Sequence, residues 1–282
     1  MVPQGFTTSG LVSLAVDLPA GTMPIGWIER ELVAPWCEQD REARWQEGPN
    51  RYPPSGDGRF VPVGPTGSAF EAVCPRLVVR PDPRIFTAIA RAALARGALT
   101  GWRDELFDVT VPSTGERLFT LERSAFRLFG LRSEAAQLVA YRPDGSVWVA
   151  RRSRTKAIDP GLLDTLVGGG VSAGENAAQT LLREAGEEAG LARIQTAQAR
   201  CSAVFELLRR TTQGVQHEQV VVFELEVDAD WRPHNGDGEV EAFLCLDAPE
   251  IARRIAGGEF AYEAGLSLEA AQAQRNQRSR GG

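Results

Sequence analysis

Residues 169–191 read G-G-V-S-A-G-E-N-A-A-Q-T-L-L-R-E-A-G-E-E-A-G-L, and this stretch decides the fold. Its spacing predicts a helix over residues 176–189, on which Glu184, Glu187 and Glu188 fall at i, i+3 and i+4. The three carboxylates then share one face within a single turn, and their mutual repulsion requires a cation. Hard divalent ions such as Mg²⁺ take oxygen ligands and are completed by substrate phosphates. The stretch therefore predicts a Mg²⁺ site, with Mn²⁺ as a substitute, for cleavage of phosphate esters or anhydrides.

The residues around the acidic face have structural explanations. The glycine run 168–170 follows the apolar run 162–167 and is expected to form a turn, where missing Cβ atoms let the backbone approach a metal or phosphate. Arg183 and Glu187 stand at i, i+4, so the guanidinium can hold a carboxylate. Gly190 suits the left-handed residue just past a helix end. A neighbouring apolar face is expected to pack on a sheet and comprises Ala178, Leu181, Leu182, Ala185 and Ala189.

The stretch also resembles the signature box of the Nudix hydrolases. It matches at every charged and glycine position, namely Gly169, Glu175, Arg183, Glu184, Glu187, Glu188 and Gly190. Ala185 departs from the pattern, which usually has a bulkier aliphatic residue there. The resemblance implies that the three clustered glutamates ligate Mg²⁺, helped by a backbone carbonyl at Gly169. It further implies that Arg183 and Glu175 hold the box in shape.

A further metal ligand or a general base is expected downstream of the box. The segment G-D-G-E-V-E at residues 236–241 resembles the place from which Nudix enzymes recruit such a group. Glu239 and Glu241 are both candidates, and spacing alone does not choose between them. Exposure at the edge of a strand is the alternative explanation for either residue.

Composition and net charge limit the kind of protein and the kind of ligand. The 282 residues are 43% hydrophobic and 24% charged, which is typical of one large or two modest globular domains. A net charge of -6 argues against a nucleic-acid partner. A local basic patch suits a small anion instead, and its Lys156, Arg151 and Arg152 are candidate ligands of a diphosphate substrate. Solvated side chains are the alternative reading of that patch.

Targeting and cysteine patterns point to an intracellular enzyme. No apolar stretch is long enough to span a membrane and no secretory signal is evident, so we expect a cytoplasmic protein with no membrane partner. The four cysteines are widely spaced, which predicts neither a zinc site nor a disulfide framework but small buried or half-buried thiols. A homodimer remains an open alternative.

The chain is expected to form two α/β domains, over residues 1–134 and 135–282. In the first, a smaller α+β domain, residues 24–36 indicate a passage from strand to helix and residues 53–67 a long loop. Asp82 as N-cap and Pro83 at the first helical position begin a helix that Gly97 ends.

The second domain is expected to be an α/β/α sandwich with a mixed sheet. Strands over 137–142 and 147–152 flank the turn Pro143-Asp144-Gly145. Further strands are expected at 162–167, 201–208, 219–227 and 241–246, with helices at 176–189 and 249–256.

Motifs outside the box resemble one branch of the family more closely. They are G-W-R-D-E-L at 101–106, L-E-R at 121–123, L-F-G at 128–130, A-R-R-S at 150–153, T-K at 155–156 and P-G at 160–161. This combination resembles the Nudix enzymes related to thiamine pyrophosphokinase, which carry an extra N-terminal domain. The resemblance implies hydrolysis of thiamine diphosphate, or of its oxidised or damaged forms, to a monophosphate and phosphate.

Three alternatives to this substrate or activity are open. The box alone leaves nucleotide sugars and dinucleotides as substrates. A Nudix-fold isomerase of isopentenyl diphosphate would need a histidine-rich metal site, and the chain has only two histidines. A catalytically silent ligand sensor would be expected to have lost box charges, and none is lost.

Overall fold

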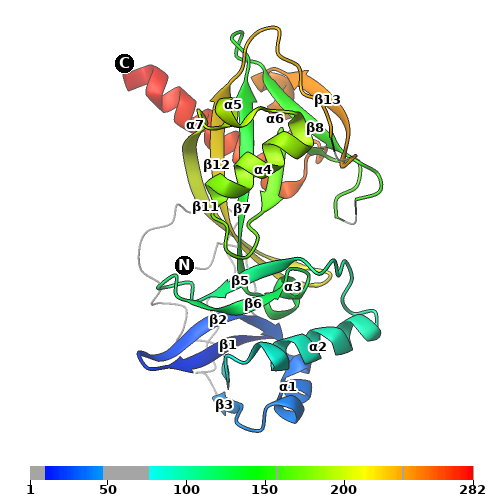
Figure 1. Ribbon diagram of the computed structural model, residues 1–282, viewed down its shortest axis with the longest axis vertical. Coiled ribbons are helices and arrows are strands. Elements are labelled where there is room, and N and C mark those ends of the chain that lie inside the picture. The colour runs from blue at the N-terminus through cyan, green and yellow to red at the C-terminus, as the bar shows by residue number, and fades with distance from the viewer. Residues whose placement is uncertain (1–9, 47–75, 157, 237, 282) are drawn as a thin grey trace. The chain divides into compact units, whose positions relative to one another are not determined.

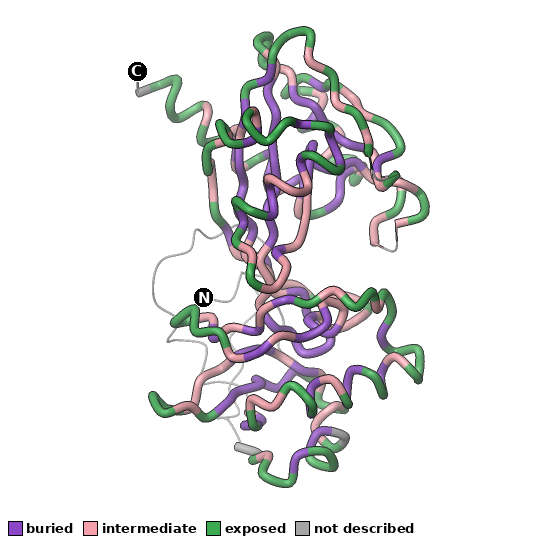
Figure 2. Tube along the Cα trace, in the orientation of Figure 1, coloured by how far each residue is buried: buried purple, intermediate pink, exposed green. Residues whose placement is uncertain are grey.

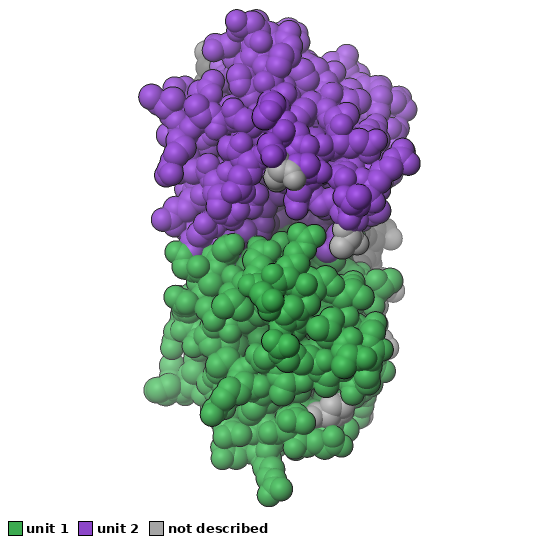
Figure 3. Space-filling model, turned by 45° about the vertical axis from the view of Figure 1, so that its right-hand side comes forward, with its two compact units in different colours: residues 1–133, 172–174, 206–219 green, residues 134–171, 175–205, 220–282 purple. Residues whose placement is uncertain are grey.

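The computed structural model describes residues 10–46, 76–156, 158–236 and 238–281. They fold into two compact units, coloured green and purple in Figure 3. Unit 1 contains residues 1–133, 172–174 and 206–219, and unit 2 contains residues 134–171, 175–205 and 220–282. A division of the chain between residues 134 and 135 stays a prediction.

The sheet of unit 1 has four strands in the order β2-β1-β4-β3. β1 (Leu11–Leu18) pairs antiparallel with β2 (Gly21–Glu29) and parallel with β4 (Arg76–Val79), while β3 (Arg44–Gln46) pairs antiparallel with β4. The first six residues of β1 are buried, as Figure 2 shows.

Helices and a hairpin complete unit 1. Their bounds are Arg30–Leu32 for the 3₁₀ helix η1, Val33–Gln39 for α1, Pro83–Ala95 for α2, Leu106–Thr110 for β5, Arg117–Glu122 for β6 and Ala125–Phe129 for α3. The passage from strand to helix at 24–36 is confirmed. So is the start of α2, where the Asp82 side chain accepts a hydrogen bond from the Arg84 backbone N–H. The loop expected at 53–67 lies outside the described residues.

Unit 2 is built on a seven-stranded mixed sheet (Figure 1). Five strands follow the order β11-β12-β7-β8-β13, while β10 pairs with β7 and β9 pairs with β8. The predicted hairpin around Pro143-Asp144-Gly145 is confirmed. The strand bounds are Arg132–Tyr141 for β7, Val147–Arg152 for β8, Leu163–Asp164 for β9, Val167–Gly170 for β10, Arg200–Thr211 for β11, Gly214–Glu226 for β12 and Val240–Leu246 for β13.

Helices cover both faces of this sheet, so unit 2 is the α/β/α sandwich expected from the sequence. α4 (Ala177–Ala189) packs on one face through Leu181 and Ala185, against residues of β7 and β12. α6 (Ala248–Ala256) and α7 (Tyr262–Gly281) pack on the other face, through Ile251 and Leu268. The short helix α5 (Arg193–Thr196) follows α4.

One predicted strand is wrong in a way that matters for the site. Residues 162–167 do not form a single strand, because β9 pairs with β8 whereas β10 pairs with β7. The glycine run 168–170 is not a turn either, since it lies within β10 and pairs with residues 135–137 of β7. Backbone hydrogen bonding to a neighbouring strand therefore overrides the turn preference of three consecutive glycines.

The exposure of the cysteines differs from the sequence expectation. The cysteines are not buried, because Cys37, Cys201 and Cys245 are free and exposed, while Cys74 lies outside the described residues. Among the described residues, no helix combines the length and the apolar character needed to cross a membrane.

Candidate functional site

α4 begins and ends at residues suited to those positions. Asn176 accepts a hydrogen bond from the Gln179 backbone N–H at 3.0 Å, and the Gln179 side chain accepts one from the Asn176 N–H at 2.9 Å, which forms a capping box. Gly190 ends the helix with a φ of 66°, the left-handed conformation predicted for it. The acidic residues of the helix are thus held between two well-defined ends.

The buried face of α4 differs in part from the predicted one. Leu181, Ala185 and Ala189 are buried as predicted, but Ala178 is exposed and Leu182 only half-buried. Ala185 is fully buried, so the small residue in the aliphatic slot of the box is packed in the core. The rest of the buried face is formed by Ala177, Thr180 and, unexpectedly for a charged residue, Glu188.

Arg183 is the hub of an ion-pair network on α4. Its Nε and Nη2 donate to the two oxygens of Glu175 at 3.2 and 3.1 Å, which is a bidentate arrangement. Its Nη1 donates to Oε1 of Glu184 at 2.7 Å and to Oε2 of Glu187 at 3.4 Å. Hydrogen bonds and charge from Glu175 and Glu184 raise the pKa of Arg183, against the lowering effect of burial. Glu175 also accepts a hydrogen bond from Thr180 Oγ1 at 2.7 Å, so it is fixed from two sides.

Glu188 is a buried carboxylate at the junction of α4 and β10. Its side chain is 7% exposed, and its Oε2 accepts a hydrogen bond from the backbone N–H of Gly168 at 3.0 Å. Burial raises the pKa of Glu188 to about 8, against the lowering effects of the Gly168 N–H and of Lys156. The charged form of this residue is therefore poorly compensated and favours a nearby cation.

Glu184 lies against the glycine run of β10. A Cβ atom built on Gly169 would lie 2.5 Å from Glu184 Oε1, so a larger residue at this position would displace the carboxylate from where it lies. Burial raises the pKa of Glu184, and the charges of Glu187 and Glu239 raise it further while Arg183 lowers it. Glu187 is the most open of the three helix carboxylates, with a side chain that is 51% exposed.

The structure separates the two downstream candidates. Glu239 pairs with Lys156, whose ammonium also lies 3.8 Å from Oε1 of Glu188. Glu241 instead lies 3.6 Å from Nε of the exposed Arg154. Glu239 is therefore the acid that the fold places beside the helix carboxylates, and Lys156 lies with it.

The two arginines expected to bind phosphate make contacts within the fold. Arg151 donates to the backbone oxygen of Gly161 at 3.0 Å. Arg152 pairs with Asp164, at 2.6 Å from Nη1 to Oδ2, and also donates to the backbone oxygen of Ile158. Their role in binding a substrate stays a prediction.

Two polar residues near the site were not assigned to it from the sequence. Asp164 is buried; burial raises its pKa, while the Arg152 partner lowers it. Gln137 is 7% exposed and pairs with Gly168 across β7 and β10, and its buried Oε1 has no hydrogen-bond partner within the described part of the chain. The sequence could have indicated this residue only through the presence of a glutamine at the start of a largely apolar predicted strand.

These residues suit Mg²⁺ in their chemistry. Hard carboxylate oxygens come from Glu184, Glu187, Glu188 and Glu239. A backbone carbonyl comes from Gly169, where the absence of a Cβ lets the Glu184 side chain lie close to the strand. In the described ranges, no three His, Cys, Asp or Glu side chains are already grouped as metal ligands. Arg183 and Lys156 lie among these carboxylates as counter-ions.

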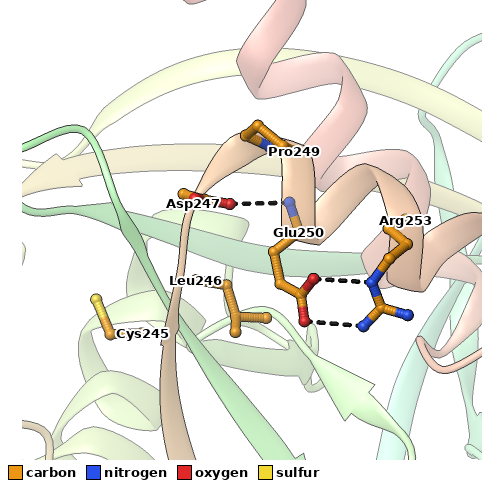
Figure 4. A pocket seen from close by; sticks show the side chains of 6 residues that line it. All are labelled: Cys245, Leu246, Asp247, Pro249, Glu250 and Arg253. Carbon is orange, nitrogen blue, oxygen red and sulfur yellow. Dashed lines mark hydrogen bonds and ion pairs between the residues drawn. The ribbon is translucent and has the colours of Figure 1, made fainter.

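A shallow hollow elsewhere in unit 2 is a weaker candidate. It lies where β13 meets α6 and is lined by Cys245, Leu246, Asp247, Pro249, Glu250 and Arg253 (Figure 4). Its charged groups satisfy one another, since both oxygens of Glu250 accept hydrogen bonds from Arg253 and Asp247 caps α6. The carboxylates around α4 therefore form the candidate site.

Known protein families match most of the second half of the chain and part of the first. Residues 131–263 match the NUDIX domain, and residues 86–133 match DUF4743, a domain of unknown function. The chain is 31% identical over 176 residues to "Nudix hydrolase 20, chloroplastic" of Arabidopsis thaliana, across 61% of this chain and 47% of that protein. It is 30% identical over 163 residues to "Nudix hydrolase 24, chloroplastic" of the same plant, across 57% of this chain and 45% of that protein.

The chain thus spans about half the length of these two curated relatives. Among solved structures, DR0079 from Deinococcus radiodurans is 26% identical with a TM-score of 0.47, covering 61% of this chain and 98% of that one. Residues 131–263, just under half of the chain, are therefore similar to the NUDIX domain.

Proposed function

We propose that the chain is a Mg²⁺-dependent hydrolase that cleaves the phosphoanhydride bond of an organic diphosphate. One observation carries this proposal: two desolvated carboxylates, Glu184 and Glu188, meet the glycine run of β10 and have raised pKa values. Desolvating two carboxylates costs free energy, and a bound cation would offset that cost. Such perturbed acids are typical of functional sites, and these lie in the segment that matches the NUDIX domain.

The acids of this site would hold the metal, and the other residues would keep them in place. We assign Glu184, Glu187, Glu188 and Glu239 as ligands, with the carbonyl of Gly169. When bound, Mg²⁺ would neutralise phosphate charge and make water a better nucleophile at neutral pH. Arg183 positions Glu184 and Glu187, because its bidentate bond to Glu175 fixes the guanidinium.

The proposed reaction consumes one water and releases a monophosphate and phosphate. Water supplies the oxygen that replaces the bridging oxygen on one phosphorus, and its proton is taken by a carboxylate such as Glu239 or one of the helix glutamates. The other phosphate group leaves with the bridging oxygen, as the organic monophosphate when the terminal phosphorus is attacked and as inorganic phosphate when the inner phosphorus is attacked. Lys156 lies beside these acids, where its ammonium can contact a phosphate.

For the organic half of the substrate we propose thiamine diphosphate or its oxidised analogues. The motifs G-W-R-D-E-L at 101–106 and A-R-R-S at 150–153 support this choice, because they resemble the thiamine-related branch of the family. Nucleoside diphosphate derivatives are the competing class, because the box itself demands only a diphosphate.

A comparison of substrates tests the function. The full chain would be incubated with Mg²⁺ and either thiamine diphosphate, its oxidised form, a nucleoside diphosphate or a nucleotide sugar, and kcat/KM would be measured for each. We expect the thiamine compounds to exceed the others by about tenfold or more, which is roughly 1.4 kcal/mol of transition-state discrimination. A nucleotide derivative preferred by the same margin would contradict the thiamine assignment and leave the hydrolase assignment standing.

A further inference from the structure

Lys156 occupies the carboxylates that we assign to the metal. Its ammonium pairs with Glu239 Oε2 and lies 3.8 Å from Oε1 of Glu188, and the lysine side chain is only 15% exposed. Glu188 and Glu239 belong to α4 and to the segment before β13, far apart in the sequence. A single lysine therefore bridges the two sources of proposed metal ligands.

We propose that Lys156 is an exchangeable counter-ion: it neutralises Glu188 and Glu239 until Mg²⁺ binds, and its ammonium then moves to the phosphate of the substrate. This inference rests on the proposed function, because it requires the metal at the same acids. It adds that metal binding and substrate binding are coupled through one side chain.

The physical reason for the exchange is the cost of unpaired buried charge. The Glu188 side chain is only 7% exposed and its Oε2 accepts one hydrogen bond, from the Gly168 N–H, so a neighbouring ammonium stabilises its carboxylate. A divalent ion on the same oxygens removes that need and repels the lysine. Lysine suits an exchange because its compact charge is carried on a flexible four-carbon stem.

The backbone around Lys156 is hydrogen-bonded to the segment that carries Glu239. The N–H of Lys156 donates to the backbone oxygen of Ser153 at 3.1 Å, and the N–H of Ser153 donates to the backbone oxygen of Glu239 at 2.9 Å. These bonds tie the loop to the same segment that carries Glu239. A released ammonium would therefore stay next to the site, within reach of a bound phosphate.

Arg183 shows what a fixed counter-ion looks like in the same site. It also contacts two proposed ligands, Glu184 and Glu187, but its guanidinium is anchored by the bidentate bond to Glu175. The two carboxylates that Lys156 contacts, Glu188 and Glu239, are both assigned metal ligands. When metal binds, we therefore expect Arg183 to stay on Glu175 and Lys156 to leave its carboxylates.

The test measures metal and phosphate binding separately on the full chain. Calorimetry would give the Mg²⁺ affinity of metal-free wild type and Lys156→Met, and then the affinity for methylene diphosphonate, a non-hydrolysable diphosphate, at saturating Mg²⁺. We expect Lys156→Met to bind Mg²⁺ about 3- to 10-fold more tightly, because a competing charge is lost. We expect it to bind methylene diphosphonate about tenfold more weakly, because a phosphate contact is lost.

Arg154→Met is the matched control. It removes the same charge from the same loop, but Arg154 is 83% exposed and pairs with Glu241, outside the site. Both affinities are expected to stay within about twofold of wild type, because an exposed pair contributes little. Lys156→Arg keeps the charge and is expected to bind Mg²⁺ no more tightly than wild type.

The outcomes separate this inference from the proposed function. Opposite changes in the two affinities, confined to Lys156→Met, support the exchange. An unchanged or weaker Mg²⁺ affinity in Lys156→Met, or an equal effect of Arg154→Met, overturns the exchange while wild-type binding of Mg²⁺ leaves the function intact. Failure of the wild type itself to bind Mg²⁺ overturns the proposed function.

Discussion

A Cβ atom on Gly169 would lie 2.5 Å from Oε1 of Glu184, whereas one on the preceding residue, Gly168, would find no atom nearer than 3.7 Å. The two glycines are neighbours in one strand, β10, and differ in what lies over them. A side chain at Gly169 would therefore displace the Glu184 carboxylate, whereas one at Gly168 would meet no comparable contact.

We expect Gly169→Ala to impair hydrolysis without unfolding the protein. The new methyl group would displace the flexible end of Glu184, so turnover should fall about tenfold or more while the melting temperature changes little. Gly168→Ala is the control and should retain most activity. Steady-state rates and thermal melts of both variants check this, and equal losses in the two would mean that crowding of Glu184 is not the cause.

Arg183 and Glu175 should act as one unit. Arg183→Lys cannot keep the bidentate bond and still reach Glu184 and Glu187, so we expect a loss of about tenfold or more in kcat/KM. Glu175→Gln should cause a similar loss by releasing the guanidinium.

The double variant Arg183→Lys/Glu175→Gln measures their coupling. Because the two residues hold one another, its loss should be much smaller than the product of the single losses. Multiplicative losses would show that Glu175 does not act through Arg183.

The stability of unit 1 should depend on pH through Glu206. His217 and Arg132, at 3.8 and 3.3 Å from its Oε1, hold the pKa of Glu206 at about 2, below its ordinary value of 4.5. A depressed carboxyl pKa stabilises the fold above pH 4.5, and this stabilisation is lost as the pH falls toward 2.

Glu206→Gln should therefore lower stability at pH 7 by on the order of 1 kcal/mol, a figure reduced for solvent screening, and by almost nothing near pH 2. Denaturant unfolding at several pH values measures this. Glu226→Gln is the control, because Glu226 is 79% exposed in its pair with Arg275. A destabilisation by Glu206→Gln that does not change with pH would contradict the prediction.

The elements that could be predicted from sequence are those with strong local signals. α2 and α4 have good N-caps and spaced apolar residues, and the hairpin at 143–145 has a compact turn. α7 was not predicted, because its apolar residues show almost no helical periodicity over the full length and only its first half is buried. The strand β10 was not predicted because its pairing with β7 is a tertiary contact that glycines do not signal.

The same distinction holds for the site. The acids of α4 follow from helical spacing, which is a local property. The choice of Glu239 over Glu241 depends on where Lys156 and Arg154 lie, and Asp164 pairs with Arg152 of a different strand. Those relationships join segments that are distant in the sequence, so spacing could not determine them.

The central claim is that the carboxylates of α4 support metal-dependent hydrolysis of a diphosphate. The most direct measurement is phosphate release from thiamine diphosphate and competing diphosphates by wild type, Glu187→Gln and Glu188→Gln, with Mg²⁺ saturating or removed by a chelator. We predict release by the wild type only with metal, and a loss of about 100-fold or more in each variant while the fold and its stability are retained. Near wild-type rates in either variant at saturating Mg²⁺, or release by the wild type without metal, would contradict the account.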